Sequence, residues 1–217
     1  MKTGKTVKVL LALTTAAGML AGCGSKTDTD TFRFANDTDI VGMDSTVVDD
    51  AMSFNAITAI TDGLTTVDVK GNTIPGIAKS WDVSNNGLTY TFHLRDAKWA
   101  NGDDVTAQDF VYSWHRIIKN AGNYAYMLGS EGASIKNADS LINLGTAATD
   151  EQLNTLGIKA TDDKTVVVDL EKNVPYFVGL MSFPCYFPQN QKFVEKCGKK
   201  YATKPEYILG NGAYKMT

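Results

Sequence analysis

Residues 88–118 constrain the fold more than any other part of the chain, because a strand pattern leads directly into a helix pattern. Apolar and polar residues alternate from Leu88 to Leu94, which is typical of a strand with one buried face. After a turn around Gly102, Thr106 and Asp109 have the spacing of a capping box at a helix start. The following helix carries one apolar stripe, made of Phe110, Val111, Trp114, Ile117 and Ile118. The block therefore predicts a half-buried strand followed by an amphipathic helix.

Other strands and helices are expected without strict alternation along the chain. Alternating or glycine-punctuated runs predict a strand at 31–35 and two hairpins, at 64–74 and 157–170. Helical spacing predicts a helix from Ser53 to about residue 62, and further helices are expected at 174–181 and 191–200. Loops and short helices are expected between them, at 120–145. This mixture predicts the α/β (mixed α+β) class.

The first 31 residues have the composition of an export signal followed by a tether. Three lysines precede an uncharged apolar stretch at 9–20, which is shorter than the roughly 20 residues of a membrane-spanning helix and suits a secretory signal. Leu-Ala-Gly directly before Cys23 matches the lipobox of bacterial lipoproteins. We therefore expect a signal peptide at 1–22, lipidation of Cys23, and a flexible polar tether at 23–31. The chain would then be anchored in the cell membrane, facing outside the cytoplasm. The alternative is an ordinary signal peptide with an incidental cysteine.

Charge and cysteine content limit the partners and the chemistry. Loss of the three signal lysines takes the net charge from −3 to about −6, and we expect no basic patch and no aromatic-and-arginine stretch of the kind that binds phosphate backbones. Nucleic acid is therefore not an expected partner. Beyond Cys23, only Cys185 and Cys197 remain. In an exported protein they could form a disulfide, and two buried thiols are the alternative.

Catalytic chemistry finds no support in the sequence. The two histidines, His93 and His115, fit surface or structural positions, and no metal-ligand, phosphate-cradling or nucleophile motif is present. The adjacent pairs Asp49-Asp50 and Asp162-Asp163 would point to opposite faces in a strand. We expect no enzyme activity, no metal and no cofactor. The three tryptophans are assigned to the core.

The block 88–117 closely resembles the peptide-binding lipoproteins that serve oligopeptide ABC importers, which are extracellular solute-binding proteins of family 5. Further segments match that family in the same order and at matching spacing. They are 62–64, 75–81, 156–160, 174–177 and 211–214. The likeness extends over about 32–217, which is nearly all of the chain after the tether.

The resemblance implies a periplasmic-binding-protein-like type II lobe with an inserted second domain. Residues 32–61 and 189–217 would form parts of the first domain, and 62–188 the insertion. Because relatives are much longer, the C-terminal lobe would be missing, as in a truncated product or a fragment. The implied function is capture of oligopeptides outside the membrane and delivery to the permease subunits of an ABC importer, by a monomer.

The resemblance also implies a ligand loop at 43–51. Asp49 falls on an acidic position that pairs with the α-ammonium of the peptide, and Ala51 falls on a position that binds through its backbone. Asp50 lies between them and is included in the expected site. The alternative is that Asp49 and Asp50 are a solvated loop pair. For the whole chain, the alternatives are another solute (a dipeptide, a nickel chelate, a sugar or a signalling peptide) or a membrane-displayed fragment without a transport role.

Overall fold

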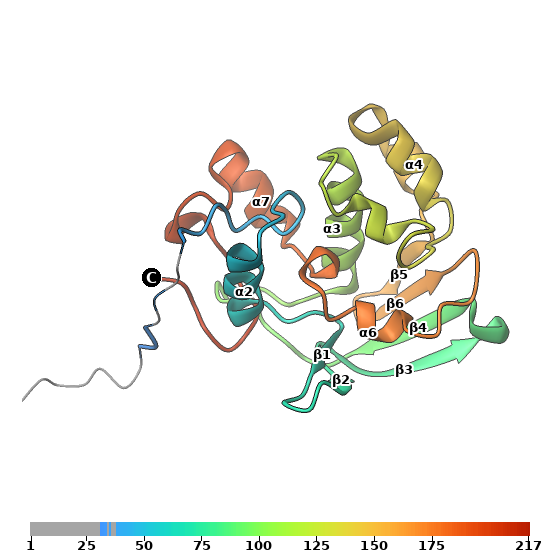
Figure 1. Ribbon diagram of the computed structural model, residues 1–217, viewed down its shortest axis with the longest axis horizontal. Coiled ribbons are helices and arrows are strands. Elements are labelled where there is room, and N and C mark those ends of the chain that lie inside the picture. The colour runs from blue at the N-terminus through green and yellow to red at the C-terminus, as the bar shows by residue number, and fades with distance from the viewer. Residues whose placement is uncertain (1–30, 34, 36–37) are drawn as a thin grey trace, which may run out of the picture. The chain divides into compact units, whose positions relative to one another are not determined.

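A four-stranded antiparallel sheet organises the body of the chain, with the strand order β3-β4-β6-β5 (Figure 1). The computed structural model describes residues 31–33, 35 and 38–217, and 38–217 form one unit. The strands of the sheet are β3 (Ala78–Ser84), β4 (Thr89–Leu94), β5 (Ile158–Asp162) and β6 (Thr165–Asp169). A separate hairpin pairs β1 (Thr65–Val67) with β2 (Thr73–Pro75).

The sheet is accompanied by helices, of which α3 (Ala107–Lys119) packs directly on it. The helices are α2 (Ala51–Ile60), α3, α4 (Ala138–Leu144), α5 (Asp150–Leu153), α6 (Phe177–Leu180) and α7 (Gln191–Cys197), with 3₁₀ turns at 85–87, 125–128, 145–147, 184–186, 198–200 and 205–207. Within the part of the chain that the structure describes, none of them combines the length and the apolar character needed to cross a bilayer.

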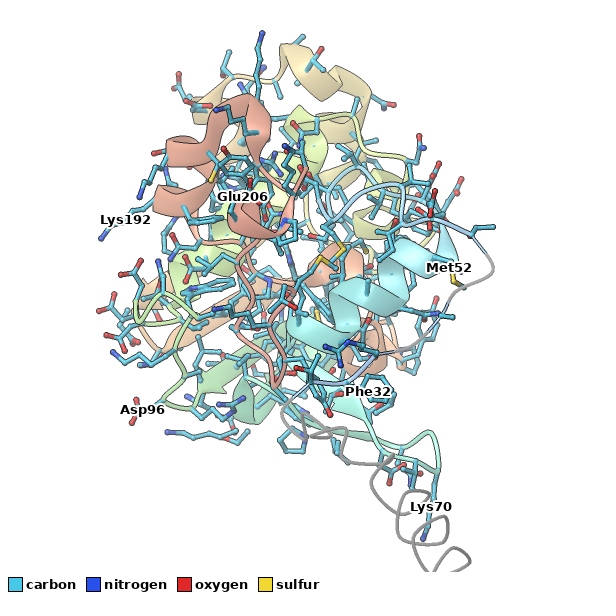
Figure 2. All side chains as sticks on the ribbon, turned by 90° about the vertical axis from the view of Figure 1, so that its left-hand side faces the viewer. Phe32, Met52, Lys70, Asp96, Lys192 and Glu206 are labelled. Carbon is cyan, nitrogen blue, oxygen red and sulfur yellow. The ribbon has the colours of Figure 1, made fainter. Side chains whose placement is uncertain are left out.

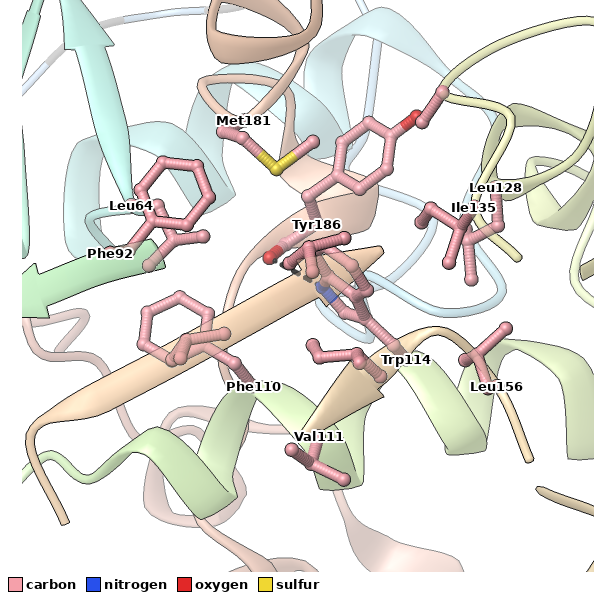
Figure 3. Packing of buried hydrophobic residues seen from close by; sticks show 14 of the residues in the cluster. Leu64, Phe92, Phe110, Val111, Trp114, Leu128, Ile135, Leu156, Met181 and Tyr186 are labelled. Atoms are coloured by element: carbon pink, nitrogen blue, oxygen red, sulfur yellow. Dashed lines mark hydrogen bonds between the residues drawn. The ribbon is translucent and has the colours of Figure 1, made fainter. Parts of the chain in front are cut away.

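Helix α3 packs against β5 and β6, and its apolar stripe enters the main core (Figure 3). The alternation of β4 appears in its burial, since Tyr90, Phe92 and Leu94 are buried while the residues between them are half-buried. Trp114 is fully buried and donates its indole N–H to the carbonyl oxygen of Tyr186 at 3.0 Å. Burying each such side chain contributes about 1.5–3 kcal/mol, so the interface between α3 and the sheet is a main source of stability.

The buried apolar side chains form two clusters. The larger cluster extends in sequence from Leu64 to Tyr186. The smaller cluster is built on α2 and consists of Met43, Val48, Phe54, Ala56, Ile57, Ile60, Phe187 and Ala202. The chain thus passes between the clusters near 60–64 and again near 186–187. At the first passage, the Asn211 side chain accepts from the amide of Asp62 at 2.7 Å, so the C-terminal segment lies beside it.

The structure confirms the α/β class, both hairpins and the helix capped by Thr106 and Asp109. The strand expected at 31–35 is wrong, because 31–33 and 35 lie in no strand. Alternation alone cannot make a strand without a ladder partner, and the described strands pair with one another. The disulfide is also wrong, since Cys185 and Cys197 are both free thiols. Of the alternative, two buried thiols, only Cys185 is buried, in the larger core cluster, whereas Cys197 is half-buried.

Candidate functional site

The segment 44–51 forms an ordered loop that leads into α2. Asp44 shapes its first part, because one carboxylate oxygen accepts from the amide of Thr46 at 3.1 Å and from the Thr46 hydroxyl at 2.8 Å. The carbonyl oxygen of Asp44 also accepts from the amides of Val47 and Val48, at 3.0 and 3.1 Å. An aspartate side chain that accepts a hydrogen bond from the backbone two residues further along the chain commonly stabilises a turn. The loop therefore has a defined backbone conformation.

Arg116 of α3 and Gln189 tie this turn to distant parts of the chain. The guanidinium of Arg116 donates to Asp44 at 2.7 Å, to the Thr46 hydroxyl at 2.9 Å and to the Gln189 side-chain oxygen at 3.0 Å. The Gln189 amide group in turn donates to Asp44 and to the Ser45 hydroxyl, each at 3.0 Å. The side chains of Arg116 and Asp44 are only 19% and 13% exposed. Burial alone would raise the pKa of Asp44, but the hydrogen bond and the charge of Arg116 outweigh it and hold the pKa below its usual 3.8.

The C-terminal end of α3 supports the loop from a second side. Asn120, the C-cap residue, donates from its side chain to the Thr46 hydroxyl at 2.7 Å. Gly122 lies so close that a Cβ there would collide with the Thr46 carbonyl oxygen. The Asn123 side chain donates to one carboxylate oxygen of Asp49. Three residues after α3 thus fix both the position of the turn and one face of Asp49.

The three predicted site residues are adjacent in the chain but differ in their surroundings. Asp49 is exposed, and one of its two carboxylate oxygens is engaged by Asn123. Asp50 is the N-cap of α2 and accepts from the amide of Ser53 at 2.8 Å. Hydrogen bonds from Ser53 lower the pKa of Asp50 below its ordinary value. Ala51 is exposed and is the first residue of α2, where a backbone N–H has no intrahelical acceptor.

The two neighbouring aspartates thus differ, because the Asp50 carboxylate caps α2 and the Asp49 carboxylate is exposed to solvent. The Asp50 cap uses one carboxylate oxygen, and the other, Oδ2, is buried without a hydrogen-bond partner among the described residues. Asp49, in contrast, is exposed and has one carboxylate oxygen bonded to Asn123. The sequence analysis overlooked Asp44, Arg116 and Gln189. Only Asp44 carries a local signal, because an aspartate two residues before a threonine favours a turn. Cys23, the predicted lipidation site, lies outside the described residues.

Other reactive groups do not assemble into a second site. Within the described residues, no three His, Cys, Asp or Glu side chains lie close enough together to hold a metal ion. His93 pairs with Asp82 at 2.8 Å on the sheet surface. His115 is half-buried, and burial lowers its pKa, so its charged form is disfavoured. Trp99 and Trp114 are buried and Trp81 packs on the same core, as expected.

Comparison with known proteins identifies the family. Residues 72–217 match the family model described as "Bacterial extracellular solute-binding proteins, family 5 Middle". The chain is 40% identical to a dipeptide-binding protein of Lactococcus lactis over 99% of its length, and 37% identical to the periplasmic oligopeptide-binding protein OppA of Salmonella typhimurium over 97%. It spans 38% of the length of each of these two relatives.

Solved structures give the same result for the fold. The substrate-binding domain of an oligopeptide ABC transporter from Bacillus anthracis superposes with a TM-score of 0.79 at 37% identity, covering 86% of this chain and 35% of that one. Haemophilus influenzae OppA in complex with RPPGFSPFR gives a TM-score of 0.73 at 39% identity, covering 80% and 33%. The fold is thus that of the periplasmic peptide-binding proteins, and the chain belongs to the bacterial extracellular solute-binding proteins of family 5.

Proposed function

We propose that the chain is the solute-binding component of an ABC importer and captures oligopeptides outside the membrane for uptake. The observation that carries this proposal is the loop 44–51, which presents an exposed carboxylate at Asp49 and begins α2 at the exposed Ala51, where a backbone N–H has no intrahelical acceptor. An anion next to a backbone donor suits the ammonium and the first carbonyl group of a peptide.

In this proposal, Asp49 binds the peptide's α-ammonium through the carboxylate oxygen that Asn123 leaves available. A hydrogen bond between charged groups contributes about 1.5–3 kcal/mol. The amide at Ala51 donates to peptide main chain, which is present whatever the peptide sequence. Asp50 acts indirectly, by capping α2 and thereby fixing the position of that amide. Because Arg116 already holds the loop, little ordering entropy is lost on binding.

The proposal includes the domain layout and the anchor. Residues 32–61 and 189–217 belong to the first domain and 62–188 to the insertion. The two hydrophobic clusters support this division, since α2 and residues after 186 build the smaller one. Lipidated Cys23 and the tether at 23–31 hold the body at the outer face of the membrane, where it works as a monomer with the permease subunits. The lipobox sequence supports the anchor.

A second candidate ligand is a dipeptide. The relative from Lactococcus lactis is named a dipeptide-binding protein and is 40% identical, whereas the OppA proteins are named for oligopeptides. Both ligand classes carry an α-ammonium, so Asp49 has the same role in either case. The length of the bound peptide distinguishes them.

Calorimetric titration with dipeptides and with tri- to pentapeptides tests the function. We expect saturable heat with peptides that have a free amine. Asp49→Asn should weaken them about 10- to 150-fold and leave N-acetylated peptides unchanged. Asp163→Asn, which neutralises an exposed aspartate of the β5–β6 turn, is the matched control and should change neither. Equal loss for free and acetylated peptides would remove Asp49 from its role, and absence of heat with every peptide would contradict the function itself.

A further inference from the structure

The surface of α7 and the segment after it is strongly basic, although the chain as a whole has a net charge of −3. Five exposed lysines lie within thirteen residues, and we call them the lysine face. They are Lys192, Lys196, Lys199, Lys200 and Lys204. Figure 2 looks onto this side of the molecule, where Lys192 projects outward from its helix. The expectation that the chain has no basic patch is therefore wrong.

The lysines are arranged so that their charges add. Lys192 and Lys196 are one helical turn apart on α7 and therefore lie on one side of it. Gly198, with φ of 53°, ends the helix, and two more lysines follow in the next turn. Among the described residues, none of the five forms an ion pair. The nearby Glu195 accepts instead from Gln191 at 2.7 Å. The lysine face thus keeps its positive charge.

The lysine face lies close to the point where the chain enters the folded body. Ile40, near the start of the unit formed by 38–217, packs against the smaller hydrophobic cluster. Tyr201 and Ile208, which follow the lysines, pack against the same cluster. Met43 and Ser45 line one small pocket together with Tyr201 and Ala202. The lysine face therefore adjoins a segment that lies near the first residues of the body formed by 38–217.

Local helix stability accounts for only part of this pattern. Cations at the end of a helix interact favourably with its dipole, but the effect is confined to the last turn. In the seven-residue helix α7, Lys196 alone occupies the last turn. Lys192 stands at the opposite end, where a positive charge is unfavourable, and Lys204 lies beyond the helix altogether. Mutual repulsion among the lysines opposes their gathering, so an anionic partner explains it better.

We propose that the lysine face docks on the anionic phospholipid headgroups of the membrane to which the chain is tethered, and so sets the orientation of the body on that membrane. The proposal rests on the proposed anchoring only for the proximity of the membrane. Lysines within a Debye length of an anionic surface, about 8 Å in physiological salt, are attracted to it. Each such lysine raises the membrane partition coefficient about fivefold.

Vesicle co-sedimentation of the full chain tests this proposal. The vesicles are phosphatidylcholine alone or phosphatidylcholine with phosphatidylglycerol, at low and at high salt. The test variant carries Lys192→Gln, Lys196→Gln and Lys199→Gln, which are exposed positions. The matched control makes the same charge change at Lys70, Lys79 and Lys159, three exposed lysines of the hairpin and the sheet. A third variant replaces the same three test lysines by arginine.

We expect the test variant to bind phosphatidylglycerol vesicles about a hundredfold more weakly. The control and the arginine variant should change by about twofold or less. High salt should abolish the difference. Equal loss in test and control variants, no loss in the test variant, or equal binding of the wild type to both vesicle types would each overturn the proposal. Peptide titration should be unaffected by the test variant, so failure of the docking and failure of the proposed function give separate results.

Discussion

Replacing Arg116 by methionine should leave the Asp44 carboxylate largely buried and without its positively charged partner. Both side chains are less than one-fifth exposed, and removing one partner of a buried ion pair typically costs about 3–5 kcal/mol. Asp44 would still accept from Thr46 and Gln189. We therefore expect a loss of about 3 kcal/mol, at the lower end of that range. Urea unfolding followed by tryptophan fluorescence should show a lower midpoint with an unchanged slope.

Two further measurements distinguish the effect of leaving the Asp44 charge buried without a partner from the effect of lost packing around Arg116. In an Asp44→Asn background, Arg116→Met should cost about 1–3 kcal/mol less than it does in the wild type. Lowering the pH should also reduce the difference in unfolding free energy between the wild type and the Arg116→Met variant. Ionised Asp44, with its lowered pKa, stabilises the wild type above pH 3.8 and loses that contribution as the pH falls through the folded-state value. In the Arg116→Met variant, burial raises the pKa of Asp44. Protonation of Asp44 therefore removes the cost of burying its charge at a higher pH than in the wild type. Either of two results would refute the reasoning: a cost of Arg116→Met below about 1 kcal/mol of unfolding free energy, or an equal cost in the wild type and in the Asp44→Asn background.

Two other predictions concern tight packing. Gly122→Ala should destabilise the chain by about 1–3 kcal/mol and weaken peptide binding, because the new Cβ would displace the Thr46 carbonyl. Gly179→Ala, a helical position where the nearest atom is 3.4 Å away, should lower neither the urea midpoint nor the affinity. Iodoacetamide followed by peptide mass spectrometry should label Cys197 in the native chain and spare Cys185, because Cys185 is fully buried and burial raises its thiol pKa. Labelling of Cys185 at the rate of Cys197, or protection of both, would contradict the described packing.

Elements with strong local signals were predictable from the sequence. The alternation of β4 and the capping box of α3 specify their own conformations within a few residues. Strand β3 was missed because it is mostly exposed, so no apolar alternation marks it. Its strand conformation comes from pairing with β4 along almost its whole length. Such pairing is a tertiary property that a single segment does not display.

The candidate site was only partly predictable for the same reason. Asp49, Asp50 and Ala51 are proposed as site residues only through resemblance to a family, and their different surroundings are visible only in three dimensions. The cap at Asp50 requires the helix to begin at 51, two residues before the apolar spacing suggests. Arg116 sits on a helix whose periodicity assigns it simply to the polar side. Nothing in the sequence near Arg116 indicates that it reaches Asp44.

The bonds of Arg116 and Gln189 to Asp44 also bear on the order in which the chain acquires its shape. These contacts join residues 72 and 145 positions apart. Closing long loops is entropically unfavourable, so contacts of this kind form late unless local structure has brought the ends together. During synthesis, Gln189 emerges long after the segment around Asp44. The contacts of the loop with Arg116, Asn120 and Asn123 can therefore form before the contacts with Gln189, which complete the support of Asp44 only after the segment after 186 has been made.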